Sequence, residues 1–187
     1  MKILILGIGN ILFGDEGIGP HLANLIEEKY DFISNDNEVE IIDGGTLAHR
    51  LIPIITDYDQ VVIIDCVNVD DGEIGDVYNF NFSDMPEYIK WDGSAHEVEM
   101  LQTLQMIEMM GDLPPTKIIG VVPYVIGEDT TFSMTEEVVK ASLTMEKVIV
   151  DFIKTFDIEV KNKNPNLSIE EVSKHTYIKG ITYDISS

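Results

Sequence analysis

The sequence is poor in cysteine and in basic residues, and these two shortages exclude several kinds of site. The single cysteine, Cys66, rules out an internal disulfide and a cysteine-rich zinc or iron–sulfur site. Only 12 lysine and arginine residues stand against 34 acidic residues, which gives a net charge of −22. Because phosphate-binding proteins need clustered basic residues, we expect neither a nucleic-acid partner nor binding to an anionic membrane. The acidic balance favours a basic protein partner, or reflects adaptation to a salty or hot cytoplasm.

Long apolar runs are scarce as well. No stretch approaches the roughly 20 apolar residues that a membrane-spanning helix needs. The apolar opening Lys2–Gly7 is too short for a signal peptide, and the polar residues Asn10, Asp15 and Glu16 follow it closely. We therefore expect a cytoplasmic protein. A chain of 187 residues with 44% hydrophobic residues is typical of one domain with a sizeable core.

Strand-like apolar runs alternate with helical patterns through residue 154. Strands are predicted over Lys2–Gly7, Glu38–Asp43, Val61–Val67, Asp76–Phe82 and Thr116–Val122. Helices are predicted over Ile18–Tyr30, from Thr46 to about Ile55, over Glu97–Met110 and over Thr135–Lys154. This alternation predicts an α/β fold with a largely parallel sheet that helices cover on both faces.

The pattern weakens after Phe156. We expect an α/β domain over residues 1–156 and a C-terminal extension over residues 157–187 that is packed or loosely ordered. Within it, Lys161–Asn166 is typical of a loop, and Tyr177–Ser187 of a strand or a loosely held tail. Because their apolar pattern is poor, residues beyond Asp157 should matter little to the core.

A glycine-rich segment, Gly7-Ile8-Gly9-Asn10, links the first strand to the first helix. A dinucleotide-binding loop occupies this place in other α/β proteins, so a nucleotide-binding enzyme is one alternative. However, Leu12 stands at the position of that motif's third glycine, and Asp15 and Glu16 would repel a pyrophosphate at the helix start. The glycines fit better a sharp turn that presents Glu16. Asp15 itself is typical of a solvated or helix-favouring charge.

The same segment, continued by Gly14–Gly19, resembles the opening motif of the hydrogenase maturation proteases. The resemblance runs in order to residue 154 through Asp43-Gly44-Gly45-Thr46, Val62–Cys66, Ser94-Ala95-His96 and Gly120–Pro123. Two segments, His96–Glu99 and Gly111–Pro115, look most like the proteases of methanogen deazaflavin-reducing hydrogenases. The segment from about residue 157 onward has no counterpart.

The resemblance implies a three-layer α/β sandwich around a twisted, mostly parallel five-stranded sheet. It implies an endopeptidase that removes the C-terminal extension of a nickel–iron hydrogenase large-subunit precursor after nickel insertion. The nickel then arrives with the precursor, and no organic cofactor is expected. We expect the protein to be a monomer. Glu16, Asp65 and His96 correspond to the two carboxylates and the imidazole that contact the metal in this family.

The residues themselves support this trio. Glu16 follows the first strand, Asp65 ends the third, and His96 precedes a helix in a loop that can arch over the same sheet edge. Two carboxylates and an imidazole suit a borderline divalent metal and leave positions for thiolates from a substrate. Plainer interpretations are a helix-start acid for Glu16 and a surface or packing residue for His96. Asp43 either contacts the substrate or its site, or caps a turn.

No serine or cysteine triad is readable, and Cys66 is better explained as a core residue than as a nucleophile. A hydrolase must then use a metal-activated water or a carboxylate base. His21, His49 and His175 lack partners in the sequence and are interpreted as structural, and the methionines at 100–110 as helix packing or a partner surface. A non-proteolytic nickel-binding or assembly-checkpoint protein on the same fold is a further alternative.

Overall fold

A five-stranded sheet forms the centre of the molecule, in the order β3-β1-β4-β8-β6. The computed structural model describes residues 1–46, 48–91, 95–124 and 130–184, without the side chains of 95, 96 and 177–184. The strands of the sheet are β1 (Lys2–Ile8), β3 (Glu38–Gly45), β4 (Gln60–Cys66), β6 (Val77–Asn81) and β8 (Thr116–Val121). Strands β3, β1, β4 and β8 are parallel, and β6 runs antiparallel to β8. The predicted α/β architecture with a mostly parallel five-stranded sheet is confirmed.

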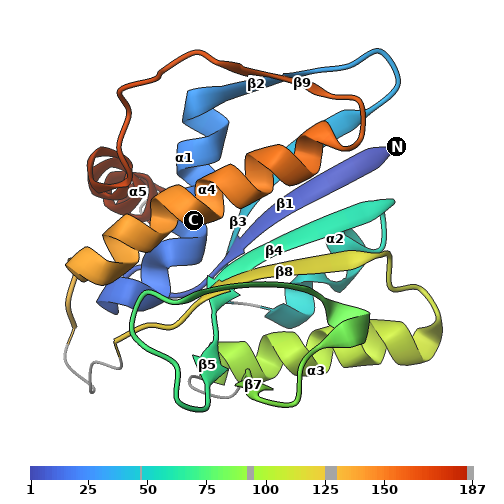
Figure 1. Ribbon diagram of the computed structural model, residues 1–187, viewed down its shortest axis with the longest axis horizontal. Coiled ribbons are helices and arrows are strands. Elements are labelled where there is room, and N and C mark those ends of the chain that lie inside the picture. Colours follow the sequence, from blue (N-terminus) through green and yellow to red (C-terminus); the bar gives the residue numbers. More distant parts are fainter. Residues whose placement is uncertain (47, 92–94, 125–129, 185–187) are drawn as a thin grey trace.

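Helices cover both faces of this sheet, as Figure 1 shows. The long helices are α1 (Ile18–Lys29), α3 (Ala95–Met110), α4 (Glu136–Lys154) and α5 (Ile169–Asp184). Because successive side chains of a strand point to opposite faces, Val62 and Ile64 of β4 pack with α1, α4 and α5, whereas Val61 and Ile63 pack with α3. The described helices include none that is long and apolar enough to cross a membrane.

The shorter elements lie mostly in the connections between these layers. They are the 3-10 helices η1 (Gly14–Gly17), η2 (Ala48–Leu51) and η3 (Phe82–Asp84), the helix α2 (Ile52–Ile55), and the strands β2 (Tyr30–Ile33), β5 (Asn68–Val69), β7 (Ile89–Lys90) and β9 (Glu159–Asn162). The helix expected from Thr46 onward is shorter than predicted: it begins at Ala48 as a 3-10 turn and continues as four α-helical residues. Pro53 lies in that short helix, where its missing N–H does no harm.

The C-terminal part contributes more to the core than its sequence indicated. β9 pairs antiparallel with β2, and residues 177–184 belong to helix α5 instead of a strand or tail. Ile158, Ile169 and Val172 are buried in the same core as α1 and α4. The expectation that residues beyond Asp157 matter little to the core is therefore wrong at these three positions. In Figure 1, α5 lies beside α1 and α4.

The chain leaves β1 and β4 toward opposite faces of the sheet. The connection after β1 leads to α1 on one face, whereas the chain after β4 passes through the edge strand β6 before it reaches α3 on the other face. Two adjacent parallel strands whose connections diverge in this way leave a crevice beyond their carboxyl ends, where open α/β sheets bind their ligands. The topology places Glu16, in the β1–α1 connection, and Asp65, near the end of β4, at this edge of the sheet.

Candidate active site

Glycines bring the loop that carries Glu16 back against the end of β1. Gly9 has a φ of +143°, and a Cβ there would lie 1.9 Å from the carbonyl oxygen of Glu16. A Cβ on Gly7 would lie 2.2 Å from the carbonyl oxygen of Gly19 in α1. Neither position has room for a side chain, so the two glycines hold η1 and the start of α1 close to the sheet. The Glu16 side chain is half-buried in this loop.

Asp15, the neighbour of Glu16, is fully buried, which corrects the interpretation of a solvated charge. Its carboxylate accepts hydrogen bonds from the backbone N–H of Tyr124 at 2.9 Å and of Thr135 at 2.6 Å. The Thr135 hydroxyl donates a third bond at 2.9 Å. Thr135 also caps α4, since its hydroxyl accepts a bond from the N–H of Val138. Asp15 therefore ties the η1 loop to the segment after β8 and to the start of α4, and so fixes the position of Glu16.

Asp65 lies near the carboxyl end of β4 and is only 2% exposed. One carboxylate oxygen accepts a hydrogen bond from the N–H of Cys66 at 2.8 Å. The other accepts a bond from the indole N–H of Trp91 at 2.9 Å. These two donors fix the direction of the carboxylate, and an ionised carboxylate has further lone pairs for another donor or a cation.

The surroundings of Asp65 disfavour its negative charge. Burial raises the pKa of Asp65 well above its ordinary value, and the nearby charges of Glu97 and Glu16 raise it further. The hydrogen bonds from Cys66 and Trp91 oppose this shift without cancelling it. The charge of Glu16 thus reaches Asp65, and so does that of a third acid that the sequence analysis did not single out.

That third acid, Glu97, is 3% exposed in the first turn of α3. From the sequence alone, Glu97 is not distinguished from an ordinary solvated acid such as Glu99. However, Glu97 precedes the buried residues Met100, Leu104 and Ile107 by three, seven and ten residues, which is the spacing of one helix face. This spacing is the sequence signal by which the burial of Glu97 could have been predicted. The sequence contains no such signal for Trp91, because its role depends on the direction of one N–H group.

The side chain of His96 lies outside the described residues, so its place in the trio stays a prediction. The backbone of His96 is the second residue of α3, directly before Glu97. Because the charge of Glu97 reaches Asp65, α3 begins close to the carboxyl end of β4. The described side chains, which exclude His96, contain no group of three histidine, cysteine or acidic residues that could hold a metal ion.

The two residues with alternative roles, Asp43 and Cys66, both have structural contacts. Asp43 lies at the end of β3, where its carboxylate accepts bonds from the N–H of Gly45 at 3.1 Å and from the side-chain amide of Asn24 at 3.2 Å. The first bond is the predicted turn cap. The Cys66 thiol is buried and donates to the carbonyl oxygen of Asp15 at 3.3 Å. Burial, followed by the charge of Asp65, raises the pKa of this thiol well above its ordinary value, so it stays protonated and is a poor nucleophile.

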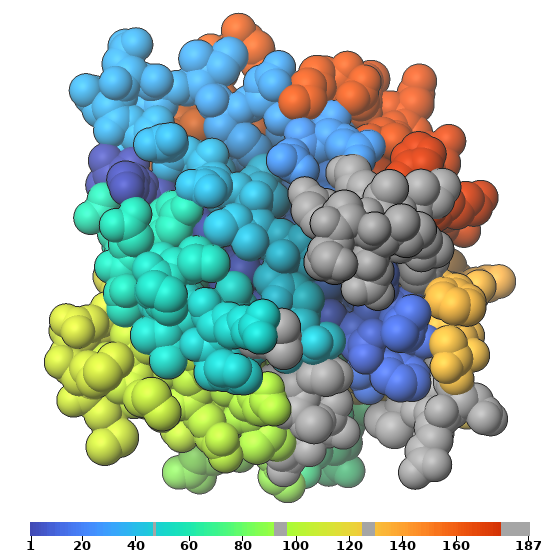
Figure 2. Space-filling model, turned by 180° about the vertical axis from the view of Figure 1, so that it is seen from behind, coloured from blue at the N-terminus to red at the C-terminus, as the bar shows by residue number. Residues whose placement is uncertain are grey.

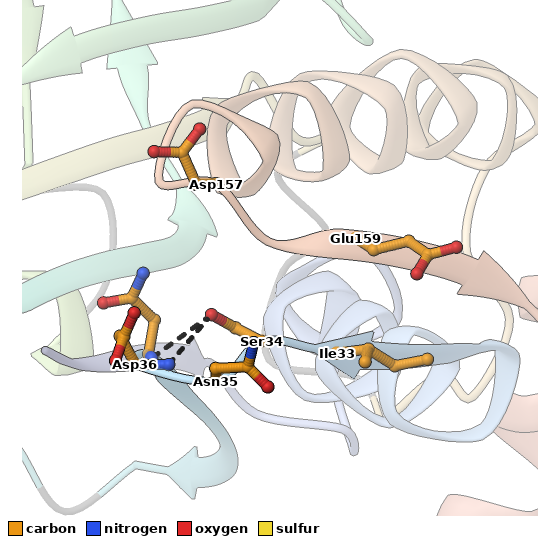
Figure 3. Close-up of a pocket in the computed structure, with 7 residues that line it drawn as sticks. Ile33, Ser34, Asn35, Asp36, Asp157 and Glu159 are labelled. Atoms are coloured by element: carbon orange, nitrogen blue, oxygen red, sulfur yellow. Dashed lines mark hydrogen bonds between the residues drawn. The ribbon is translucent and has the colours of Figure 1, made fainter.

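The other three histidines lie on three different elements. His21 is buried in α1, whereas His49 and His175 are exposed on η2 and α5. A separate hollow of about 360 Å³ lies beside the turn that precedes β3, and Figure 3 shows its polar lining. This hollow borders the starts of the strands, at the opposite edge of the sheet from Glu16 and Asp65. It is lined by Ile33, Ser34, Asn35, Asp36, Asn37, Asp157 and Glu159, which include neither an imidazole nor a thiol.

Comparison with known proteins gives consistent matches along the chain. A family model described as hydrogenase maturation protease matches residues 20–152. Protein HydD from Wolinella succinogenes is 48% identical over 157 residues, which cover 84% of this chain and 98% of HydD. The hydrogenase 2 maturation protease of Escherichia coli is 29% identical over 124 residues, or 66% of this chain and 74% of that protein. The solved hydrogenase maturating endopeptidase HybD from E. coli has the same fold, with a TM-score of 0.75 at 22% identity over 87% of this chain and 98% of HybD.

Proposed function

Because the chain belongs to the hydrogenase maturation protease family, we propose that it recognises nickel in its substrate through Glu16, Asp65 and His96. The protein is an endopeptidase that cleaves the C-terminal extension from a nickel–iron hydrogenase large subunit. The proposal concerns how it distinguishes a nickel-loaded precursor from an empty one. In this account nickel is part of the substrate, and no organic cofactor takes part.

The observation that carries this proposal is the crowding of acids around Asp65. Glu16 and Glu97 place negative charge next to a carboxylate that is already buried. Such a cluster is unfavourable on its own, because burial and the like charges of its neighbours both disfavour an ionised Asp65. A divalent ion that arrives with the substrate offsets this repulsion. Nickel-loaded precursor is then bound more tightly than empty precursor for a simple electrostatic reason.

The donor set fits nickel held jointly by two proteins. Carboxylate and imidazole ligands suit borderline divalent ions, and three such ligands leave coordination positions for thiolates of the precursor. Trp91 and the N–H of Cys66 fix the Asp65 carboxylate before the metal arrives. Asp15 and the glycines fix the loop of Glu16. Nickel bound in this way orients the scissile bond or polarises its carbonyl group, and a precursor without nickel is not positioned for cleavage.

The substrate has two candidate sources. The segments His96–Glu99 and Gly111–Pro115 support the precursor of a methanogen deazaflavin-reducing hydrogenase. The 48% identity with HydD of W. succinogenes supports instead the large-subunit precursor of a nickel–iron hydrogenase outside that group. Each precursor is incubated with the protein, with and without nickel, and its mass is measured. We expect a mass loss equal to a C-terminal peptide in the nickel-loaded sample alone.

Two other outcomes of the same assay contradict parts of this proposal. Equal cleavage of loaded and empty precursor shows that nickel is not recognised. Binding of the loaded precursor without any loss of mass identifies an assembly-checkpoint protein in place of a protease. A nucleotide-binding enzyme is tested separately, since nucleotides would then raise the thermal unfolding temperature of the protein and divalent metals would not.

A further inference from the structure

Three large apolar side chains are exposed around the loop that carries Glu16. Leu12 is 46% exposed, Tyr124 is 53% exposed and Phe132 is 54% exposed. We call these three residues the apolar rim. Leu12 belongs to the β1–α1 connection, whereas Tyr124 and Phe132 belong to the region between β8 and α4, more than a hundred positions later. Large exposed apolar groups that gather from distant segments are typical of an interaction surface.

Backbone hydrogen bonds join the segments of Leu12 and Phe132. The N–H of Thr131 donates to the carbonyl oxygen of Leu12 at 3.1 Å, and the N–H of Gly14 donates to the carbonyl oxygen of Thr131 at 2.6 Å. Phe13 and Thr131 form an isolated parallel bridge. Leu12 and Phe132 directly adjoin this bridge, one in each of the two segments. In Figure 2 the blue surface of residues near the start of α1 adjoins the gold surface of residues near the start of α4.

The third member of the rim is tied to the same loop by Asp15. The backbone N–H of Tyr124 donates to the Asp15 carboxylate at 2.9 Å. Asp15 directly precedes Glu16, so one buried acid positions both a rim residue and the proposed nickel ligand. The rim therefore has a fixed backbone next to the candidate site. A surface that is ordered before binding loses less conformational entropy when a partner docks.

We propose that the apolar rim binds apolar side chains of the hydrogenase precursor beside the scissile bond, and so aligns its C-terminal segment with Glu16. This inference rests on the proposed function, because it takes the large-subunit precursor as the occupant. Continuity with the candidate site is the reason for choosing this occupant over a second copy of the chain. The net charge of −22 adds a physical reason: two copies repel each other, whereas an uncharged apolar segment does not feel that repulsion.

A second exposed apolar group provides a matched control. Met106, Met109 and Met110 are exposed near the end of α3, and Met109 is 88% exposed. That end of the helix leads into the start of β8, at the opposite edge of the sheet from Glu16. Removing an apolar side chain there changes the exposed surface without touching the rim. Met109→Ser is therefore the control for Leu12→Ser and Phe132→Ser.

The test measures the cleavage rate against the concentration of the nickel-loaded precursor that the wild-type protein cleaves. For Leu12→Ser and Phe132→Ser we expect KM to rise at least tenfold with kcat within about threefold of wild type, and for Met109→Ser no change in either constant. Rates within twofold of wild type for both rim variants overturn the inference, as does an equal loss in Met109→Ser. If the wild-type protein cleaves neither precursor, it is the proposed function that fails.

A second measurement does not depend on the stability of the rim variants. A photo-crosslinking amino acid replaces Leu12 in one sample and Met109 in another, and each is illuminated with the same precursor. We expect the Leu12 position to crosslink to the C-terminal segment of the precursor and the Met109 position not to do so. The proposal is contradicted if Leu12 crosslinks to a second copy of the chain and light scattering shows a dimer that Leu12→Ser abolishes. The rim would then serve self-association.

Discussion

Asp15 and Asp65 are both buried at the carboxyl edge of the sheet, but their surroundings differ. Asp15 accepts three hydrogen bonds from Tyr124 and Thr135, which lie in later segments of the chain. Asp65 accepts two hydrogen bonds and also faces the charges of Glu97 and Glu16. The contacts of Asp15 join parts of the fold, whereas those of Asp65 orient a carboxylate among other acids. Hydrogen bonds compensate the burial of Asp15, whereas the burial of Asp65 leaves a perturbed carboxylate of the kind that is common at functional sites.

The largest effect is expected when Asp65 loses its charge. Asp65→Asn keeps the shape of the side chain but removes the charge of a proposed nickel ligand, so processing of the nickel-loaded precursor should fall at least about a thousandfold, equivalent to about 4 kcal/mol. The thermal unfolding temperature should fall less than in Asp15→Asn, because relief from the charges of Glu97 and Glu16 offsets the one hydrogen bond, from Cys66 or Trp91, that the amide cannot accept. The exposed Asp71, which has a φ of +61° that asparagine tolerates, supplies the control variant Asp71→Asn. A large loss of stability in Asp65→Asn, with normal processing by the protein that remains folded, would show that Asp65 has the structural role assigned to Asp15.

Asp15→Asn should have the opposite profile. The amide accepts fewer of the three hydrogen bonds and places its own N–H groups against donors, so the free energy of unfolding should fall by about 3 kcal/mol. Urea denaturation measures this loss, with Asp71→Asn again as the control. Processing should weaken less than in Asp65→Asn when measured on folded protein at low temperature. A stability equal to that of wild type would show that these bonds do not tie the η1 loop to α4.

A third buried ionisable group, His21, shows the effect of burial on a pKa without that of a neighbouring charge. Burial lowers the pKa of His21 to about 4, below its ordinary value of 6.5. Between pH 4 and pH 6.5 the His21 imidazole therefore binds a proton in the unfolded chain but not in the folded protein. The free energy of unfolding has its full value above pH 6.5 and decreases as the pH falls toward 4. At pH 5 the loss amounts to about 2 kcal/mol. Denaturation at pH 7.5 and pH 5 measures it.

The control for this pH effect is His21→Gln, which does not titrate. Acid conditions also neutralise part of the net charge of −22, and that change affects both proteins equally. The wild type should therefore lose about 2 kcal/mol more than His21→Gln between the two pH values. Parallel losses in the two proteins would show that His21 is not buried in its neutral form.

The smallest effect is expected at Cys66. The thiol is buried and its pKa is raised, so it contributes packing and one weak hydrogen bond to the carbonyl oxygen of Asp15. Cys66→Ser can keep that bond, and processing should remain within about twofold of wild type because the thiol takes no part in the chemistry. A kinetic assay on the nickel-loaded precursor measures this. Loss of activity in a stable Cys66→Ser protein would restore the cysteine-nucleophile interpretation.

Much of the fold was predictable because its central strands carry an unambiguous pattern. A strand buried on both faces reads as a continuous apolar run, as in Val61–Ile64, and few other structures produce such a run in so short a length. Helix α5 was missed because Ile169, Val172 and Thr176 bury only a narrow stripe, which is too weak a period to recognise. The exact bounds of the helix after β3 were also missed, since only its last residues are α-helical.

The candidate site was predictable in part for a different reason. Glu16 and Asp65 follow parallel strands, and topology alone brings such positions to one edge of the sheet. The role of Asp15 depends on donors that lie more than a hundred residues away in the chain, which no local pattern reveals. Trp91 likewise acts through a single N–H group directed at Asp65. Local sequence therefore suggested the proposed ligands, and tertiary contacts were needed to identify the groups that hold Glu16 and Asp65 in place.

The most direct test of the account concerns His96, the third member of the proposed nickel site. Nickel-loaded precursor is incubated with wild-type protein, with His96→Ala and with His175→Ala, which alters an exposed histidine on α5. Cleavage is followed by mass, and the unfolding temperature of each protein is recorded. The account predicts that His96→Ala remains folded but loses at least a hundredfold in rate, whereas His175→Ala cleaves like wild type. Cleavage at the wild-type rate by His96→Ala would contradict the proposal that this imidazole recognises the nickel of the substrate.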